Sequence, residues 1–154
     1  MDEQVFNPAL QSRRTGLSWD KEFRPRVDDI KKALSVEGVE LKNRSLFLLC
    51  LALGWEGKSN PGVPPRATDS ARLDTLQDSD WALFNAIAMD DSGGFEILAS
   101  KDGVLDIVEG YAAGGLRILA EKLDSSNSLT ESLIQDIWPK LDAWSPSIQA
   151  NDED

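Results

Sequence analysis

A phosphate-binding loop is the first chemistry that the sequence suggests. Residues 52–59, Ala-Leu-Gly-Trp-Glu-Gly-Lys-Ser, fit the loose form of that motif in which alanine replaces the first glycine. In the motif, backbone N–H groups wrap the phosphates, the lysine meets the terminal ones, and a helix follows directly. Residues 60–65, Asn-Pro-Gly-Val-Pro-Pro, cannot form that helix. We therefore interpret residues 52–59 as the end of a helix that runs into a loop, and we expect no nucleotide cofactor there.

Acidic side chains are the second source of chemistry. Asp90, Glu96 and Lys101 resemble the acid–acid–lysine set of magnesium-dependent nucleases, in which Asp90, Asp91 and Glu96 would be the metal ligands. Such sets lie on a strand hairpin, however, and the chain has almost no sequence typical of strands. None of the acidic clusters has the spacing of a calcium loop, and several lie where helix starts favour negative charge. We expect no metal site, and a nuclease subunit stays a weaker alternative.

Basic and aromatic side chains gather in the first third of the chain. Nine arginines and lysines lie between residues 13 and 44, with two aromatic rings among them. Arginine beside aromatic rings can contact phosphates and stack on bases. These cations could instead pair with acids of the same segment, or dock on an acidic partner or on the acidic half of another copy of the chain. The residues expected to contact a partner or DNA are Arg13, Arg14, Trp19, Arg24, Arg26, Lys31, Lys32 and Trp55. Both tryptophans fall in predicted loops, where exposed aromatic rings would indicate a binding surface.

Composition excludes the commonest forms of catalysis. The 154 residues include no histidine, so a Ser-His-Asp or Cys-His arrangement and a histidine metal site are excluded within one subunit. The single cysteine excludes an internal disulfide. Formal net charge is −11, which makes a partner coated uniformly with phosphate unfavourable. We assign no catalytic residue and expect a protein that is not an enzyme.

Charge is distributed unevenly along the chain. Residues 1–72 hold 12 of the 16 basic and 10 of the 27 acidic residues, a net charge of +2. Residues 73–154 hold the other 4 basic and 17 acidic residues, a net charge of −13. The longest apolar run, residues 46–53, is far shorter than the roughly 20 residues that span a bilayer. With no secretory signal at the start, we expect a cytoplasmic protein with two differently used surfaces and no membrane partner.

Helical periodicity predicts an all-α fold, a single compact domain of about five helices. The helices are expected near residues 25–34, 44–53 with Gly54 as C-cap, 81–89, 102–123 and 128–144, with a long Gly/Pro-rich loop at 55–68. Residues 95–99 form a short apolar helix or strand. We expect a flexible basic arm at residues 1–20, a helical domain at 21–144 and a disordered acidic tail at 145–154.

Two adjacent glycines interrupt the apolar stripe of the longest predicted helix. Gly114 and Gly115 cost about 1 kcal/mol each relative to alanine in a helix interior. They either break the helix or allow another backbone to approach closely, and we favour close packing. Tyr111 lies one turn earlier on the same stripe, so we group these three residues as helix-packing residues. Trp81 and Trp138 fall at positions typical of a helical core.

Two segments together resemble a known family. Residues 45–57, Ser-Leu-Phe-Leu-Leu-Cys-Leu-Ala-Leu-Gly-Trp-Glu-Gly, are similar to an apolar helix and glycine turn of small proteins associated with bacterial DNA phosphorothioation (Dnd) systems. Residues 107–119, which contain Tyr-Ala-Ala-Gly-Gly-Leu, resemble the Tyr-Ala-Asn-Gly-Gly-Leu stretch of the same family, the fourth type of associated protein. The resemblance spans residues 26–123, and Ala113 departs from its asparagine. It implies an accessory protein of a modification or restriction system that defends against foreign DNA.

The residues and the resemblance lead to one preferred hypothesis for the function and two alternatives. We expect a non-enzymatic adaptor that docks on larger subunits of a DNA modification or restriction system. Its acidic half would meet a basic partner or imitate DNA, and its basic arm would meet a second partner or DNA. A direct DNA-binding module that uses residues 13–44 is the alternative, and a metal-dependent nuclease subunit is the weaker one. The sequence leaves the oligomeric state open.

Overall fold

The computed structural model describes residues 14–35, 38–65 and 71–149, and in these ranges the chain is all-α, as predicted. The helices of these ranges are α1 (Arg24–Leu34), α2 (Asn43–Glu56), the 3₁₀ helix η2 (Leu73–Thr75), α3 (Asp78–Ser92), the 3₁₀ helix η3 (Glu96–Ala99), α4 (Lys101–Ser125) and α5 (Leu129–Gln149). Over the same ranges the structure has no strand, and Gly16 and Arg72 form an isolated antiparallel β-bridge. No helix of the described ranges has the length and apolarity to cross a membrane.

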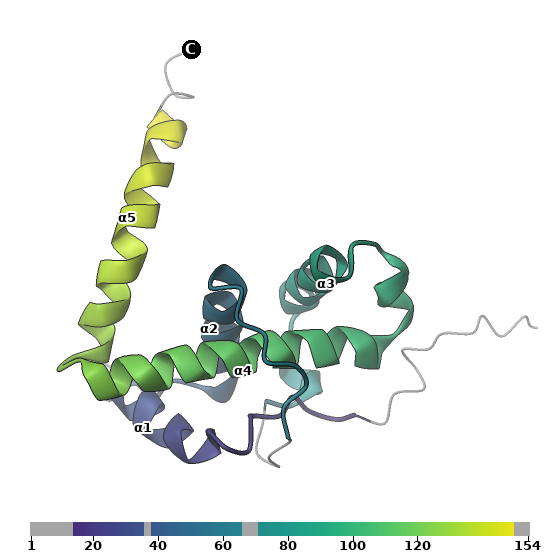
Figure 1. Cartoon of the computed structure of the whole chain (residues 1–154), viewed down its shortest axis with the longest axis horizontal. Helices are drawn as coiled ribbons and strands as arrows, with labels where there is room; N and C mark the ends of the chain where they lie inside the picture. The colour runs from purple at the N-terminus through teal and green to yellow at the C-terminus, as the bar shows by residue number, and fades with distance from the viewer. Residues whose placement is uncertain (1–13, 36–37, 66–70, 150–154) are drawn as a thin grey trace, which may run out of the picture.

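Helix α4 is the central element, and α1, α2 and α3 pack around it (Figure 1). Most of its residues from Val104 to Ala120 are buried, because they face neighbours on more than one side. The core beside it contains three aromatic rings in series, Trp19, Phe47 and Phe84, with centroid separations of 5.8 and 6.0 Å. Burial of large rings provides much of the hydrophobic stabilisation of so small a domain.

Helices α2 and α4 touch backbone to backbone. A Cβ added to Gly115 would fall 1.7 Å from the carbonyl oxygen of Cys50, and one added to Gly54 would fall 1.8 Å from that of Tyr111. Helix α4 continues unbroken through both of its paired glycines. The predicted C-cap at Gly54 is therefore wrong: this glycine lies inside α2, where it allows the close approach, and the helix ends at Glu56 with Gly57 as its cap.

The N-terminal segment differs from the expected flexible arm. Residues 14–20 lie against the helices, with Leu17 and Trp19 buried. The N–H of Leu17 donates to the carbonyl of Ala71 at 2.8 Å, and the N–H of Leu73 donates to the carbonyl of Thr15 at 2.9 Å. Burial and hydrogen bonding therefore tie this segment to the body. The rest of the expected arm, residues 1–13, lies outside the described residues.

The remaining helices begin near their predicted starts but run longer. Helix α3 begins at Asp78, where the side chain of Gln77 and that of Asp80 form a capping box. The apolar piece at residues 95–99 is the 3₁₀ helix η3. In the predicted cap of α5, the N–H of Glu131 donates to Ser128 Oγ at 3.3 Å. Helix α5 continues to Gln149, beyond the predicted end at 144, and residues 150–154 lie outside the described ranges.

Candidate functional site

The predicted contact residue Arg14 is engaged inside the protein. Its guanidinium forms ion pairs with Asp106 at 2.8 Å and with Glu109, both on α4. Glu109 also accepts a hydrogen bond from the backbone N–H of Ser18 at 3.1 Å, and its side chain is fully buried. Because these contacts hold the N-terminal segment on α4, Arg14 has a structural role here. Arg13 lies outside the described residues.

The other predicted basic contacts lie on helix α1, and most have acidic neighbours. Arg26 of α1 forms a bidentate pair with Asp124 near the end of α4, with one N–O distance of 3.1 Å. Arg24 lies 3.8 Å from Asp28, one turn further along α1. In Lys31 the ammonium donates to Asn43 at 3.0 Å and lies 3.5 Å from Glu40, while Lys32 is exposed. The structure thus favours the pairing of these cations within the chain over a continuous basic surface.

The two tryptophans predicted to contact a partner do not form an exposed loop surface. Trp19 is 2% exposed and belongs to the core. Trp55 lies in the last turn of α2, partly buried, with its ring edge-on to that of Tyr111 at 5.2 Å between centroids. The expectation of two exposed loop aromatics is therefore wrong, because both rings supply packing area that this small core needs.

Tyr111 forms a polar corner between α2, α3 and α4. Its hydroxyl donates a hydrogen bond of 2.5 Å to Asp91 Oδ1. This bond, together with burial, raises the pKa of Tyr111 to about 12, because loss of the proton would place two negative charges side by side. A cavity of about 410 Å³ adjoins the corner and is lined by Trp55, Glu56, Lys58, Asp90, Asp91 and Tyr111. A phenol with a raised pKa is a poor base and a poor nucleophile at neutral pH, so the corner supplies structure and polarity.

The segment that resembles a phosphate loop has the wrong geometry to bind phosphate. Residues 52–56 lie in helix α2, and the Gly-Lys-Ser that follows is at the C-terminal end of that helix. The N–H groups of Gly57, Lys58 and Ser59 donate to carbonyls of the last turn of α2, at 2.8 to 3.1 Å. A helix C-terminus carries negative partial charge, and its donors here are already used. This agrees with the interpretation of the segment as a helix end.

The acidic residues of the nuclease alternative do not converge. Asp90 and Asp91 lie at the end of α3 and Glu96 starts η3, and Asp91 is bonded to Tyr111. Within the described part of the chain, no group of three or more acidic or cysteine side chains is placed to hold a metal ion. We find no geometric support for this alternative.

An exposed apolar stripe on α5 is the most distinctive surface feature. Ile134, Ile137, Trp138 and Leu141 are 53, 39, 61 and 47% exposed, and their spacing of i, i+3, i+4, i+7 places them on one face of the helix. Figure 1 shows α5 leaving the end of α4 and projecting away from the other helices. We call these four residues the α5 stripe. Contiguous exposed apolar residues of this kind mark interaction surfaces.

Contacts with the body fix the rotation of α5 and so the direction of the stripe. Leu129 and Leu133 at its start are buried. Further along, Asp136 pairs with Lys122 of α4, and Lys140 Nζ lies 2.6 Å from Glu56 Oε1 of α2. At 100° per residue, these four positions lie about 120° around the helix from the centre of the α5 stripe. The stripe therefore faces away from the body.

Sequence reasoning missed the α5 stripe because it placed Trp138 in the core. The signal was present in the pattern: the apolar residues of α5 form two rows, one with Leu129 and Leu133 and one with the four stripe residues. One row suffices to attach a helix to a body, so a second row needs another partner.

Comparison with known proteins identifies the family. The sequence model of DNA sulphur modification system-associated protein 4 matches residues 28–147, about four-fifths of the chain. The chain belongs to this family. The matched region runs from α1 into the last turns of α5, so it includes the α5 stripe. It also confirms the resemblance seen in residues 45–57 and 107–119. No curated protein and no solved structure matches the chain.

Proposed function

We propose that this member of the sulphur modification-associated family is a non-enzymatic accessory subunit that docks on a larger protein of the DNA modification system. The observation that carries the proposal is the α5 stripe, four apolar side chains on a projecting helix. Transfer of one such side chain out of water contributes about 1.5–3 kcal/mol. A tryptophan near the centre, as Trp138 is here, is typical of the residues that dominate binding energy.

The chemistry of the partner is suggested by charge. Residues 73–154, which include α5, carry a net charge of −13. Two copies that paired through α5 would bring these like charges together, whereas a basic surface would be attracted. Proteins that handle DNA present such basic surfaces. We therefore infer a heterologous partner with an apolar groove bordered by lysine or arginine.

We favour docking over direct DNA binding because most of the basic side chains have acidic neighbours within the chain. Arg14, Arg24, Arg26 and Lys31 each have acidic neighbours within the chain, and Lys32 alone of this group is exposed without one among the described residues. Duplex binding needs several cations on one face to release counterions. The missing histidine and the absence of a convergent acidic set in the described ranges support a non-enzymatic role.

A matched pair of variants tests the proposal. Ile137→Glu adds a charge to the α5 stripe, and Gln135→Glu adds the same charge on the same helix outside the stripe. Each tagged variant is purified from cells that contain the modification system, at increasing salt, and the recovered system subunits are quantified. We expect Gln135→Glu to retain the partner at high salt, as the native protein does, and Ile137→Glu to lose it. Equal recovery with both variants, or recovery of DNA alone that is lost at moderate salt, would contradict the proposal.

A further inference from the structure

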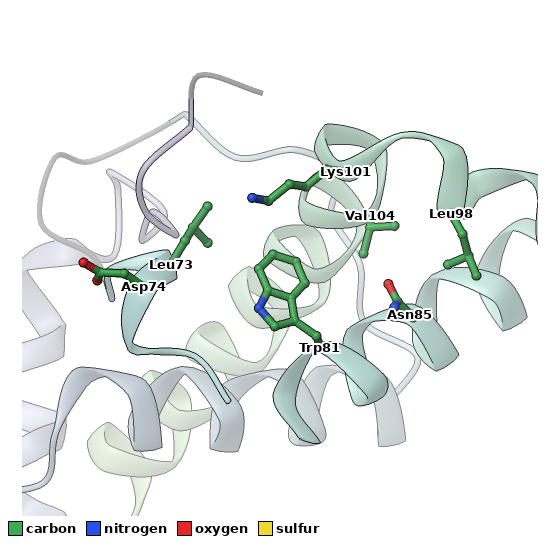
Figure 2. A pocket seen from close by; sticks show the side chains of 7 residues that line it. All are labelled: Leu73, Asp74, Trp81, Asn85, Leu98, Lys101 and Val104. Atoms are coloured by element: carbon green, nitrogen blue, oxygen red, sulfur yellow. The ribbon is translucent and has the colours of Figure 1, made fainter. Parts of the chain in front are cut away.

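A second cavity lies between η2, α3, η3 and the start of α4. Its volume is about 590 Å³, within the range of sites for small ligands. Leu73, Leu98 and Val104 provide apolar walls, and the indole of Trp81 stands between them (Figure 2). The amide of Asn85 and the ammonium of Lys101 are the polar groups directed toward this space.

Lys101 supplies positive charge that nearby carboxylates do not neutralise. Among the described residues, no acidic group lies within ion-pair distance of it. Asp74 at the rim is held by Arg72 through two hydrogen bonds of 3.1 and 2.6 Å, and Figure 2 shows its carboxylate turned away from Trp81. Asp80, on the first turn of α3, is paired with Arg44 at 2.8 Å. The cavity therefore combines an aromatic ring with one available cation.

The Lys101 ammonium lies 5.2 Å from the centroid of the Trp81 ring, on the ring face. The contact between a cation and an exposed aromatic ring raises the equilibrium constant for that arrangement by roughly 2- to 5-fold. A heteroaromatic base stacked on an aromatic side chain is worth roughly 5- to 150-fold. A planar base could therefore displace the ammonium, which would then be free to bind an anionic group attached to that base.

We propose that this cavity binds a single nucleotide unit, with its base stacked on Trp81, its phosphate on Lys101 and the edge of the base against Asn85. An amide supplies both a donor and an acceptor, which suits the edge of adenine. The net charge of −13 on residues 73–154 opposes ligands with many phosphates, so the site suits one or two. The ligand is then either a free mononucleotide or one unpaired nucleotide of a DNA strand.

Isothermal titration of the full chain tests this with three probes: deoxyadenosine monophosphate, deoxyadenosine and inorganic phosphate. The variants are Trp81→Leu and Lys101→Ala, and Lys58→Ala is the control because it removes the same charge from an exposed site just after α2, outside this cavity. Circular dichroism checks that each variant is folded. Lys101→Ala keeps the test valid if Trp81→Leu fails to fold, since it leaves the Trp81 ring in place against the core.

We expect the monophosphate to bind the native chain and the Lys58→Ala control equally. We expect Trp81→Leu to weaken it at least fivefold and Lys101→Ala about tenfold, the latter with little change for deoxyadenosine. Comparison with a single-stranded tetranucleotide separates the two sources: tighter binding of the tetranucleotide points to a DNA strand, and tighter binding of the monophosphate to a free nucleotide. Binding of inorganic phosphate alone, no binding of the monophosphate, or equal binding by native chain and both variants would overturn the proposal.

Discussion

Replacing Gly115 by alanine should destabilise the protein, although alanine is the better helix former. The added Cβ would fall 1.7 Å from the carbonyl oxygen of Cys50 and 2.5 Å from its carbonyl carbon. Ordinary contact would require α2 and α4 to separate by roughly 1.5 Å, because the obstacle is backbone, which cannot rotate away as a side chain can. Overpacking costs about 1–3 kcal/mol and occasionally more, against a helix-propensity gain of about 1 kcal/mol.

We therefore expect a net loss of about 2 kcal/mol in the free energy of unfolding, measured by urea denaturation followed by circular dichroism. In a domain of this size, that loss lowers Tm by roughly 4–8 °C. Gly103→Ala, in the first turn of the same helix, is the control: its added Cβ would meet the side chains of Ile97 and Ser100 at 3.0 and 3.1 Å. We expect the control to be near neutral. An unchanged or raised Tm for Gly115→Ala would refute the reasoning.

Three further predictions concern buried or bonded polar groups. Arg14→Ala removes the arginine partner of the buried Glu109 carboxylate, so we expect the free energy of unfolding, measured by urea denaturation, to fall by about 3–5 kcal/mol. Adding Glu109→Gln should restore part of this stability, and a fall of less than about 1 kcal/mol in the Arg14→Ala variant would contradict the prediction. Tyr111 is the chain's one tyrosine, so ultraviolet titration should show its ionisation near pH 12, moving toward pH 10 in Asp91→Asn. Because the folded pKa of Tyr111 is raised, its contribution to stability is present below pH 10 and lost as pH rises through about 12. Burial raises the pKa of the Cys50 thiol, so we expect a thiol reagent to modify it only when urea unfolds the chain; rapid modification of the native protein would contradict this.

The sequence predicts the helices well because helical periodicity and capping residues depend on neighbours along the chain. The 3.6-residue periodicity marked α1 and α4, and the Ser128 cap marked the start of α5. The end of α2 was placed too early because Gly54 has the residue type of a C-cap, whereas its position is determined by the carbonyl of Tyr111, 57 residues later in the chain. A distant backbone contact of this kind leaves no mark in the sequence around the glycine.

The surfaces were harder to predict than the elements. The sequence predicts a contact surface in the basic segment of residues 13–44. In the structure, however, Arg14 and Arg26 pair with acids on α4, more than 90 residues away in sequence. Charge sums along the chain do not reveal such pairs, because pairing depends on how the helices pack. The environments of two tryptophans differ from the predictions for the same reason. Trp19, in a loop, is buried in the core, and Trp138, on helix α5, is exposed.

Hydrogen–deuterium exchange of the protein, alone and bound to the subunit it co-purifies with, tests the central claim most directly, because it locates the interface along the chain. We predict slower exchange on binding across residues 134–141, which contain the α5 stripe, with little change in residues 14–44. Slower exchange confined to residues 14–44, with α5 unchanged, would contradict docking through the α5 stripe and favour the basic segment as the contact surface.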